Sequence, residues 1–253
     1  MSSYESSYTT IEDNVIYDNK GNVYISDSTH CLFQRNLVYA TPGNICQSET
    51  HDGISTQDGI GMGDEKQLPA ASSDNTIINN LVMGHRYNLY WWHNPAFTDG
   101  LVRVAILSNT FVNAIAATGN SNIRIGSGGS HNSSRFEDNI VLQEGTLAIS
   151  NVSGVTGITF AHNNWSKTPQ STAQGTGDVI ADPLLAQTGT IGPGLLSGNW
   201  FKILPASPAR DTAVVTNEVT EDHFRTVRGE KPDIGAHEYV QELLPPSRLR
   251  VAP

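Results

Sequence analysis

The stretch Phe33-Gln34-Arg35-Asn36-Leu37-Val38 places a bulky apolar residue three positions before an asparagine and another two positions after it. The same frame recurs along the 253-residue chain at steps of 22, 44, 29, 30 and 24 residues between successive asparagines. Steps of this size are near the length of one solenoid coil, with one step lengthened by an insertion. The frame therefore predicts a stack of coils. The asparagines are Asn14, Asn36, Asn80, Asn109, Asn139 and Asn163; the residues three before them are Ile11, Phe33, Ile77, Ile106, Phe136 and Phe160, and those two after are Ile16, Val38, Val82, Phe111, Val141 and Trp165.

Within each frame, apolar and polar residues alternate up to the asparagine, and apolar residues resume directly after it. This pattern predicts two short strands separated by a bend. Asparagine tolerates the left-handed backbone region better than most residues, so we expect the bend at the asparagine itself. Stacked coils would then align the side-chain amides in a hydrogen-bonded ladder, as in other stacked β structures.

A third strand is expected in each coil, before the other two. Its segments have apolar first and third residues, which should face the core, while the second and fourth face outward. Three strands per coil with tight bends favour an all-β, single-stranded parallel β-helix of about six coils over a β-sandwich, which would show separate hairpins. The segments are 23–27, 60–64, 89–93, 123–127 and 147–151.

Composition excludes several classes of protein. The formal net charge of −10 and a pI of about 5.1 argue against nucleic acid as a partner. No apolar run is long enough to span a membrane, and residues 1–8 lack the apolar core of a signal peptide, so we expect residue 1 to be a fragment boundary. The two cysteines, Cys31 on a strand and Cys46 in a loop, allow a disulfide, but a buried thiol and a separate loop thiol fit better.

Three motifs near the C-terminus carry a family resemblance: ADPL at 181–184, SPARD at 207–211 and PDIGAHEY at 232–239. In this order they resemble the C-terminal segment of secreted bacterial right-handed parallel β-helix proteins of the pectate-lyase-like group, and residues 22–39 look like the repeat of that group. The resemblance covers roughly residues 8–240. It implies an extracellular or cell-surface location and a right-handed helix, which the handedness of parallel crossovers also favours. It does not imply one reaction, because the group contains lyases, hydrolases, epimerases and proteins without known activity.

The expected organisation has coils over residues 1–170, a C-terminal capping segment over 171–240 and a linker over 241–253. The linker resembles one that leads into a fibronectin type III domain, so we expect a monomeric part of a larger multidomain protein. An open stack of coils needs a cap at its end. We interpret five charged residues as contacts that fasten the cap rather than as catalysts: Asp211, Arg225, Arg228, Asp233 and Glu238.

The chemistry is expected where the coils depart from their minimum length. Insertions over roughly 40–58, 64–74 and 94–100 border the face of the third predicted strand. Two outward columns on that face predict a glycine floor with aromatic walls, which suits stacking against the sugar rings of a linear polymer. Trp91, by contrast, is expected in the core. The columns are Tyr24, Gly61, Tyr90, Arg124 and Ala148, and Ser26, Gly63, Trp92, Gly126 and Ser150.

We therefore predict a polysaccharide or oligosaccharide ligand, with two open interpretations of what is done to it. A lyase acting on a uronate would need a cation at the carboxylate and a base, and a hydrolase would need two carboxylates. A non-catalytic carbohydrate-binding or display module is the alternative, and solvated loop histidines and a solvated acidic loop explain some of the same residues. The candidates for substrate binding are Tyr24, Tyr90, Trp92 and Arg86; for catalysis Arg124, His93, Asp64, Asp58 and His51; and for a Ca²⁺ ion Asp52, Asp64 and Glu65.

Overall fold

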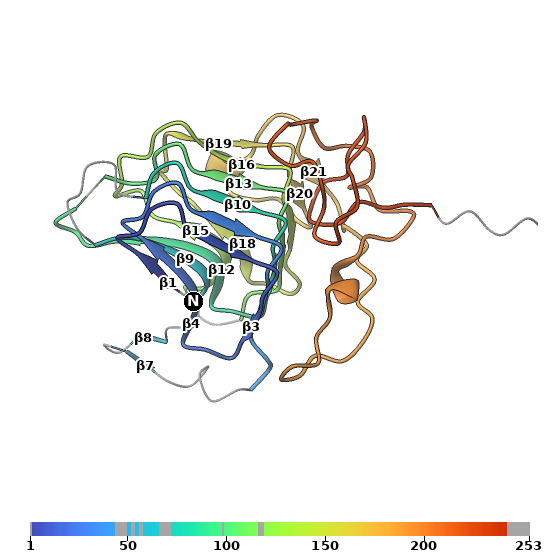
Figure 1. Ribbon diagram of the computed structural model, residues 1–253, viewed down its shortest axis with the longest axis horizontal. Coiled ribbons are helices and arrows are strands. Elements are labelled where there is room, and N and C mark those ends of the chain that lie inside the picture. Colours follow the sequence, from blue (N-terminus) through green and yellow to red (C-terminus); the bar gives the residue numbers. More distant parts are fainter. Residues whose placement is uncertain are drawn as a thin grey trace, which may run out of the picture.

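The computed structural model describes residues 2–43, 50–51, 54–55, 58–65, 72–97, 99–115 and 119–241 (Figure 1). In these ranges the chain forms a parallel β-helix of six coils, each contributing one strand to each of three sheets. The prediction of an all-β parallel β-helix is confirmed. No helix in the described ranges is both long and apolar enough to cross a membrane.

All strands of the three sheets run parallel to their neighbours. The first sheet contains β1 (Ser2–Tyr4), β4 (Gly21–Ser26), β9 (Asp58–Asp64), β12 (Tyr87–His93), β15 (Ser121–Ile125) and β18 (Ala148–Asn151). The second contains β2 (Thr10–Glu12), β5 (Leu32–Gln34), β10 (Thr76–Ile78), β13 (Ala105–Leu107), β16 (Ser134–Glu137) and β19 (Ile158–Ala161). The third contains β3 (Val15–Tyr17), β6 (Leu37–Tyr39), β11 (Leu81–Met83), β14 (Thr110–Val112), β17 (Ile140–Leu142), β20 (Asn164–Trp165) and β21 (Val179–Ile180).

Four short elements in the described ranges lie outside these three sheets. The insertion between β6 and β9 contains β7 (Thr50–His51) and β8 (Ile54–Ser55), which pair antiparallel. The C-terminal segment contains the 3-10 turns η2 (Ser171–Ala173) and η3 (Gly198–Phe201). Cys31 is buried, and Cys46 lies outside the described residues.

The six asparagines form a continuous column at the bend between the second and third sheets. The side-chain amide of each one donates to the Oδ1 atom of the next, at 3.0 to 3.2 Å. The position of the bend corrects our expectation by one residue. The left-handed residue is not the asparagine but the one before it in every frame: Asp13, Arg35, Asn79, Ser108, Asp138 and His162, with φ between 52° and 57°. The asparagine itself turns inward, where its side chain satisfies backbone groups.

The register of the first sheet agrees with the predicted columns as far as β15. Tyr24 pairs with Gly61, Gly61 with Tyr90, and Tyr90 with Arg124. In β18 the prediction is wrong by three residues, because Arg124 pairs with Asn151 rather than with Ala148. Ser150, which was expected on the outward face, pairs with Ile123 and is buried.

The interior is a continuous apolar column that includes Trp91, only 1% exposed, as predicted. Aromatic residues from neighbouring coils stack within it: the ring centroids of Phe111 and Phe136 are 6.0 Å apart, and those of Phe136 and Trp165 are 5.7 Å apart. These contacts between coils bury apolar surface that no single coil could bury alone.

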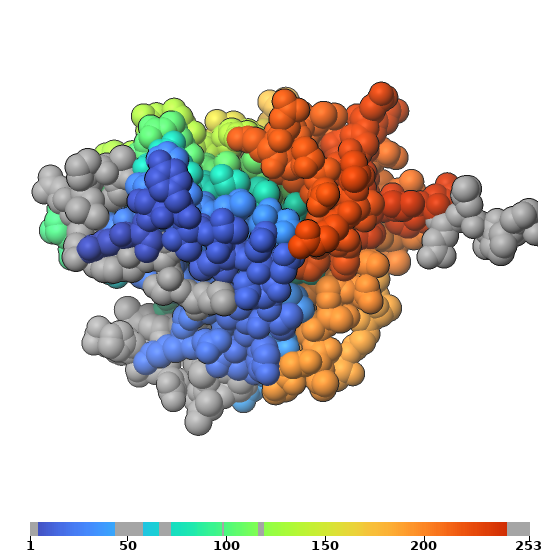
Figure 2. Space-filling model, viewed as in Figure 1, coloured from blue at the N-terminus to red at the C-terminus, as the bar shows by residue number. Residues whose placement is uncertain are grey.

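Residues 171–181 lie against the last coil: Ala173 joins the apolar interior, Asp178 accepts from the Asn163 N–H, and β21 pairs with β20. The rest of the C-terminal segment, as far as residue 241, packs along the side of the β-helix (Figures 1 and 2). Strands of the third sheet are buried on both faces, and their outer residues form a second apolar cluster with the segment. A cap over the last coil is therefore only part of the segment's contact with the β-helix, and most of the segment lies along the third sheet. The clustered residues are Leu37, Tyr39, Leu81, Met83, Val112, Ile140 and Leu142 from the sheet, and Leu185, Leu196, Trp200, Phe201, Ile203, Ala209, Ile234 and Ala236 from the segment.

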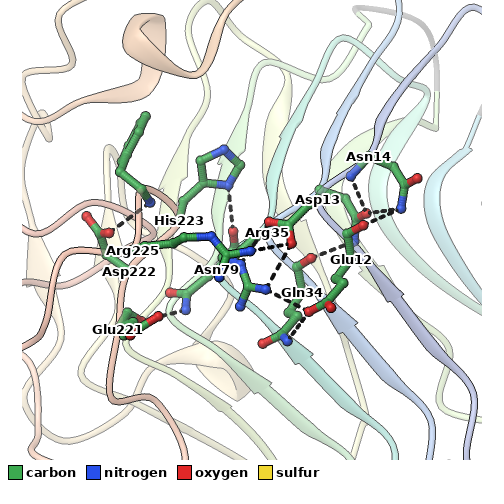
Figure 3. Close-up of polar contacts among 12 residues, drawn as sticks. Glu12, Asp13, Asn14, Gln34, Arg35, Asn79, Glu221, Asp222, His223 and Arg225 are labelled. Atoms are coloured by element: carbon green, nitrogen blue, oxygen red, sulfur yellow. Dashed lines mark hydrogen bonds and ion pairs between the residues drawn. The ribbon is translucent and has the colours of Figure 1, made fainter.

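The left-handed residues at the bends form the ridge to which the segment is fastened (Figure 3). The Arg225 guanidinium contacts Asp13 at 2.7 Å, and Asp13 is also paired with Arg35. Asn79 donates to the Glu221 carbonyl at 2.7 Å, while the His223 ring donates to the Asn79 carbonyl at 3.0 Å.

Within the segment, Arg228 and Glu238 form an ion pair at 3.2 Å, and Asp233 accepts from the backbone N–H groups of Asp211 and Tyr239. Of the five residues predicted to fasten the segment, Arg225 and Arg228 reach the β-helix, Arg228 by donating to Asn79 Oδ1 at 3.2 Å. Asp233 and Glu238 make contacts within the segment, and the Asp211 carboxylate lies 3.9 Å from Arg210.

Candidate functional site

The outer face of the first sheet is less open than a glycine floor would be. The Tyr24 ring lies across the two glycines of β9: a Cβ added at Gly61 would lie 3.3 Å from the ring, and one added at Gly63 would overlap the Tyr24 hydroxyl. That hydroxyl donates to Glu65 Oε1 at 2.7 Å. Burial and the hydrogen bond to Glu65 raise the pKa of Tyr24 above its usual value. The glycines thus make room for a flat tyrosine.

Trp92 provides a second aromatic surface on the same face. Its side chain is 38% exposed, and it pairs in register with Gly63. Among the aromatic side chains described in the first sheet, Trp92 is exposed, whereas the others are half-buried or buried. The indole therefore remains available for stacking, as predicted.

Five side chains gather where the chain bends from the third sheet into the first: Asp58, Arg86, Tyr87, Tyr90 and Arg124. We call them the arginine–tyrosine cluster. Tyr87 and Tyr90 stack with ring centroids 4.9 Å apart. The Arg86 guanidinium lies 4.7 Å from the Tyr87 ring centroid, and that of Arg124 lies 5.1 Å from the same centroid. Aromatic faces stabilise guanidinium groups held over them.

Asp58 offsets the charge of one of the two arginines. Both of its oxygens accept from Arg86, at 3.2 Å each. Burial raises the pKa of Asp58 to about 6, although both arginines act in the opposite direction. Arg124 is bound differently: it donates to the Tyr87 hydroxyl and contacts the Gly119 carbonyl at 3.4 Å. Among the described residues, no carboxylate forms an ion pair with Arg124.

Asp64 and His93 do not share this outward face, although we predicted both as catalytic. They pair in register at the ends of β9 and β12, with the same parity as the inward residues Met62 and Trp91. Asp64 is fully buried and accepts from the Gly100 N–H at 3.2 Å. Burial raises its pKa.

The His93 ring stacks on Trp91 with centroids 5.0 Å apart. Its Nδ1 lies within 3.1 Å of the Asn94 carbonyl and 2.9 Å of the Phe97 carbonyl, so that nitrogen donates. The opposite edge of the ring faces Gly128, where an added Cβ would overlap Nε2. Both predicted residues are thus packed at the strand ends, away from Tyr24 and Trp92.

The predicted metal ligands do not converge in the described part of the chain. Glu65 binds the Tyr24 hydroxyl, whereas Asp64 faces Gly100. No group of three or more His, Cys, Asp or Glu among the described residues has the arrangement of a metal site. Asp52 lies outside the described residues, and the same holds for the side chain of His51. A Ca²⁺ site that includes Asp52 stays a prediction.

Sequence reasoning missed Tyr87. Strict alternation along β12 gives it the inward parity of Leu89, but its ring stacks on Tyr90 and lies close to the Arg86 and Arg124 guanidinium groups. A signal was present in the adjacent Arg86 and in the spacing of three residues between two tyrosines.

No family model matches the chain, and no curated protein matches it. A solved structure described as the complex of XylC with xylose is similar over 92% of this chain and 50% of that one, with 11% sequence identity and a TM-score of 0.41. This chain therefore spans about half the length of that structure.

Proposed function

We propose that the protein binds an extended acidic glycan along the outer face of its first sheet. The observation that carries the proposal is Arg124, a guanidinium held on stacked tyrosines beside Arg86 in a chain whose net charge is −10. Asp58 offsets Arg86, so the cluster keeps one positive charge toward a ligand. A carboxylate or sulfate on a sugar is the natural partner, because charge-assisted hydrogen bonds to guanidinium are strong and directional.

The flat aromatic surfaces support a sugar polymer rather than a small anion. Tyr24 lies on β4 and Trp92 on β12, the two strands that flank β9. Strands in a sheet are about 4.8 Å apart, so a chain of sugar rings that crosses the strands would meet tyrosine, tryptophan and arginine in turn. The resemblance to pectate-lyase-like proteins supports the same ligand class and an extracellular setting.

Cleavage of that glycan is a second candidate function, favoured by the raised pKa of Asp58 beside two arginines. In a β-elimination, Arg124 would neutralise the uronate carboxylate. The described side chains of this face supply charge neutralisation more clearly than a base: both oxygens of Asp58 are engaged by Arg86, and burial raises the pKa of Tyr90. Binding is therefore the better supported function, and a base or a Ca²⁺ ligand from the insertion around Asp52 belongs to the second candidate.

A glycan panel separates the two functions. The protein is incubated with pectate, alginate, glycosaminoglycans and neutral glucans, with and without Ca²⁺, while binding, unsaturated-uronate absorbance and reducing ends are followed. Binding to acidic glycans without either product supports the first proposal. Both product signals together indicate a lyase, and reducing ends alone indicate a hydrolase. Failure to bind any acidic glycan would contradict the proposal.

Two variants locate the surface. We expect Arg124→Ala and Trp92→Ala each to weaken acidic-glycan binding by about tenfold or more, corresponding to about 1.4 kcal/mol. Matched controls are Arg103→Ala, an exposed arginine paired with Asp74, and Tyr8→Ala, an aromatic residue that is 77% exposed. Unchanged binding in both test variants would mean that the ligand lies elsewhere.

A further inference from the structure

A hollow of about 600 Å³ lies between the ends of β6, β11 and β14 and the C-terminal segment. We call it the corner hollow. Its volume falls within the range of small-molecule pockets, roughly 300 to 1,000 Å³. It uses none of the residues assigned to the first-sheet face, so the glycan proposal leaves it unexplained. Its apolar wall is formed by Ala40, Met83, Ile115, Ile191 and Trp200.

The walls of the corner hollow are fixed by hydrogen bonds. The Tyr39 hydroxyl donates to the Gly192 carbonyl at 3.1 Å and accepts from the Gly194 N–H at 2.8 Å, which ties the loop carrying Ile191 to the third sheet. The Gln187 N–H donates to the Trp200 carbonyl at 2.9 Å.

The floor is equally constrained. Gly84 has φ +82°, and a Cβ added there would lie 2.5 Å from the Ala40 carbonyl oxygen, so glycine permits the two coils to meet. A cavity with walls held in this way is formed before any ligand binds.

Three polar side chains converge on the apolar wall. Asn113 and Glu144 form two hydrogen bonds with each other. The Asn113 amide donates to Glu144 Oε2, and the Glu144 N–H donates to Asn113 Oδ1, both at 2.8 Å. The Gln187 side chain makes no hydrogen bond with another described residue. Glu144 is the charged member among the described residues of the lining. The hollow therefore offers amide donors and acceptors with one negative charge.

This combination selects against anions and for neutral hydroxylated rings. A carboxylate-bearing sugar would meet Glu144 without a cation to offset the repulsion. A neutral pyranose has an apolar face for the indole edge and aliphatic wall, together with hydroxyls that pair with side-chain amides and a carboxylate. We infer that the corner hollow is a second ligand site, which binds a neutral sugar unit and is independent of the acidic-glycan face.

The test uses the whole chain with methyl β-glucoside and cellobiose as neutral probes and glucuronate as the anionic probe. Binding is followed by calorimetry and by saturation-transfer NMR. We expect the neutral probes to bind and glucuronate to bind about tenfold more weakly or not at all at this site. Ile191→Trp fills the hollow from an exposed loop position and should abolish neutral binding, and Gln187→Asn should weaken it.

Leu195→Ala is the matched control, because Leu195 is 62% exposed near Ile191 and does not line the hollow. Arg124→Ala should leave neutral-probe binding unchanged, so failure of this inference and failure of the glycan proposal are separable. The inference is overturned if the neutral probes do not bind, if they bind Ile191→Trp as tightly as the unaltered protein, or if glucuronate alone is taken up.

Discussion

His85 fills a gap in a second column of buried polar side chains, at the bend that leads into the first sheet. Asn22, Gly59 and Asn88 hold equivalent positions in neighbouring coils, and Gly59 has no side chain to join the others. The Asn22 amide donates to His85 Nε2 at 2.7 Å, and His85 Nδ1 lies 3.0 Å from Asn88 Oδ1. Because an amide oxygen only accepts, Nδ1 carries the proton and the ring is neutral.

This arrangement predicts a pH-dependent contribution to stability. Burial lowers the pKa of His85 from 6.5 to about 4, so the folded state binds fewer protons than the unfolded state between these values. The contribution is fully present above pH 6.5 and is lost as the pH falls toward about 4. Its size is about 3 kcal/mol, since one pKa unit corresponds to about 1.4 kcal/mol.

The measurement compares free energies of unfolding for the unaltered protein and His85→Gln across this pH range. Asp58 and Asp138, whose pKa values burial raises to about 6, titrate in the same window with the opposite sign, so the difference between the two proteins is needed. We expect that difference to shrink by about 3 kcal/mol as the pH falls. A constant difference would contradict the role given to His85. His30→Gln, at an exposed position, is the control.

At the scale of single elements, the asparagine column should tolerate change at its end better than at its centre. Asn109→Ala removes the acceptor for both the Asn80 N–H and the Asn80 amide, and the donor to the Ile77 and Leu107 carbonyls. All of these groups are buried, so we expect a loss of about 3 kcal/mol or more in the free energy of unfolding. Asn14→Ala, at the half-buried first rung, should cost about 1 kcal/mol because water can reach its partners. Equal losses in denaturant titrations would show that the column is not cooperative.

The strands and their stacking could be predicted from sequence because each frame repeats the same apolar spacing around an asparagine. The exact bend could not, since asparagine and its predecessor are both allowed in the left-handed region, and residues as different as Arg35 and Ser108 occupy it. The shift in β18 arises in the turn before that strand, residues 143–147, where no alternation fixes the register. Asp64 and His93 have the inward parity of Met62 and Trp91, which indicates packing at the strand ends, whereas the insertions that follow them favour an exposed site.

At the scale of the whole molecule, the C-terminal segment completes a second core along the third sheet. Its position had a signal in the sequence: the segments LVY, LVM and IVL after the asparagines are apolar at every position or nearly so, as expected of strands buried on both faces. The motif PDIGAHEY contributes Asp233 and Glu238 to turn contacts and Ile234 and Ala236 to the apolar cluster. The motif therefore has a structural role in this protein.

Gly235 tests how tightly this segment is held. Its φ is +94°, and an added Cβ would lie 2.5 Å from Ile140 Cδ1, while its N–H is fixed to the Asp138 carbonyl at 2.7 Å. We expect Gly235→Ala to lower the free energy of unfolding by about 2 kcal/mol and to expose the segment to limited proteolysis. Gly229→Ala, where an added Cβ meets nothing within 4 Å, should behave as the unaltered protein does. Equal resistance of the two variants to proteolysis would mean that the contact between Gly235 and Ile140 accommodates an added methyl group without weakening the docking of the segment.

The central functional claim is that the first-sheet face recognises the negative charge of a glycan through Arg124. The most direct measurement is the affinity for one acidic glycan, polygalacturonate, before and after methyl esterification, which removes the charge and keeps the sugar backbone. We predict that esterification or high salt reduces the affinity by about tenfold or more, and that Arg124→Ala removes the difference between the two forms. Equal binding of the charged and esterified forms by the unaltered protein would contradict the claim.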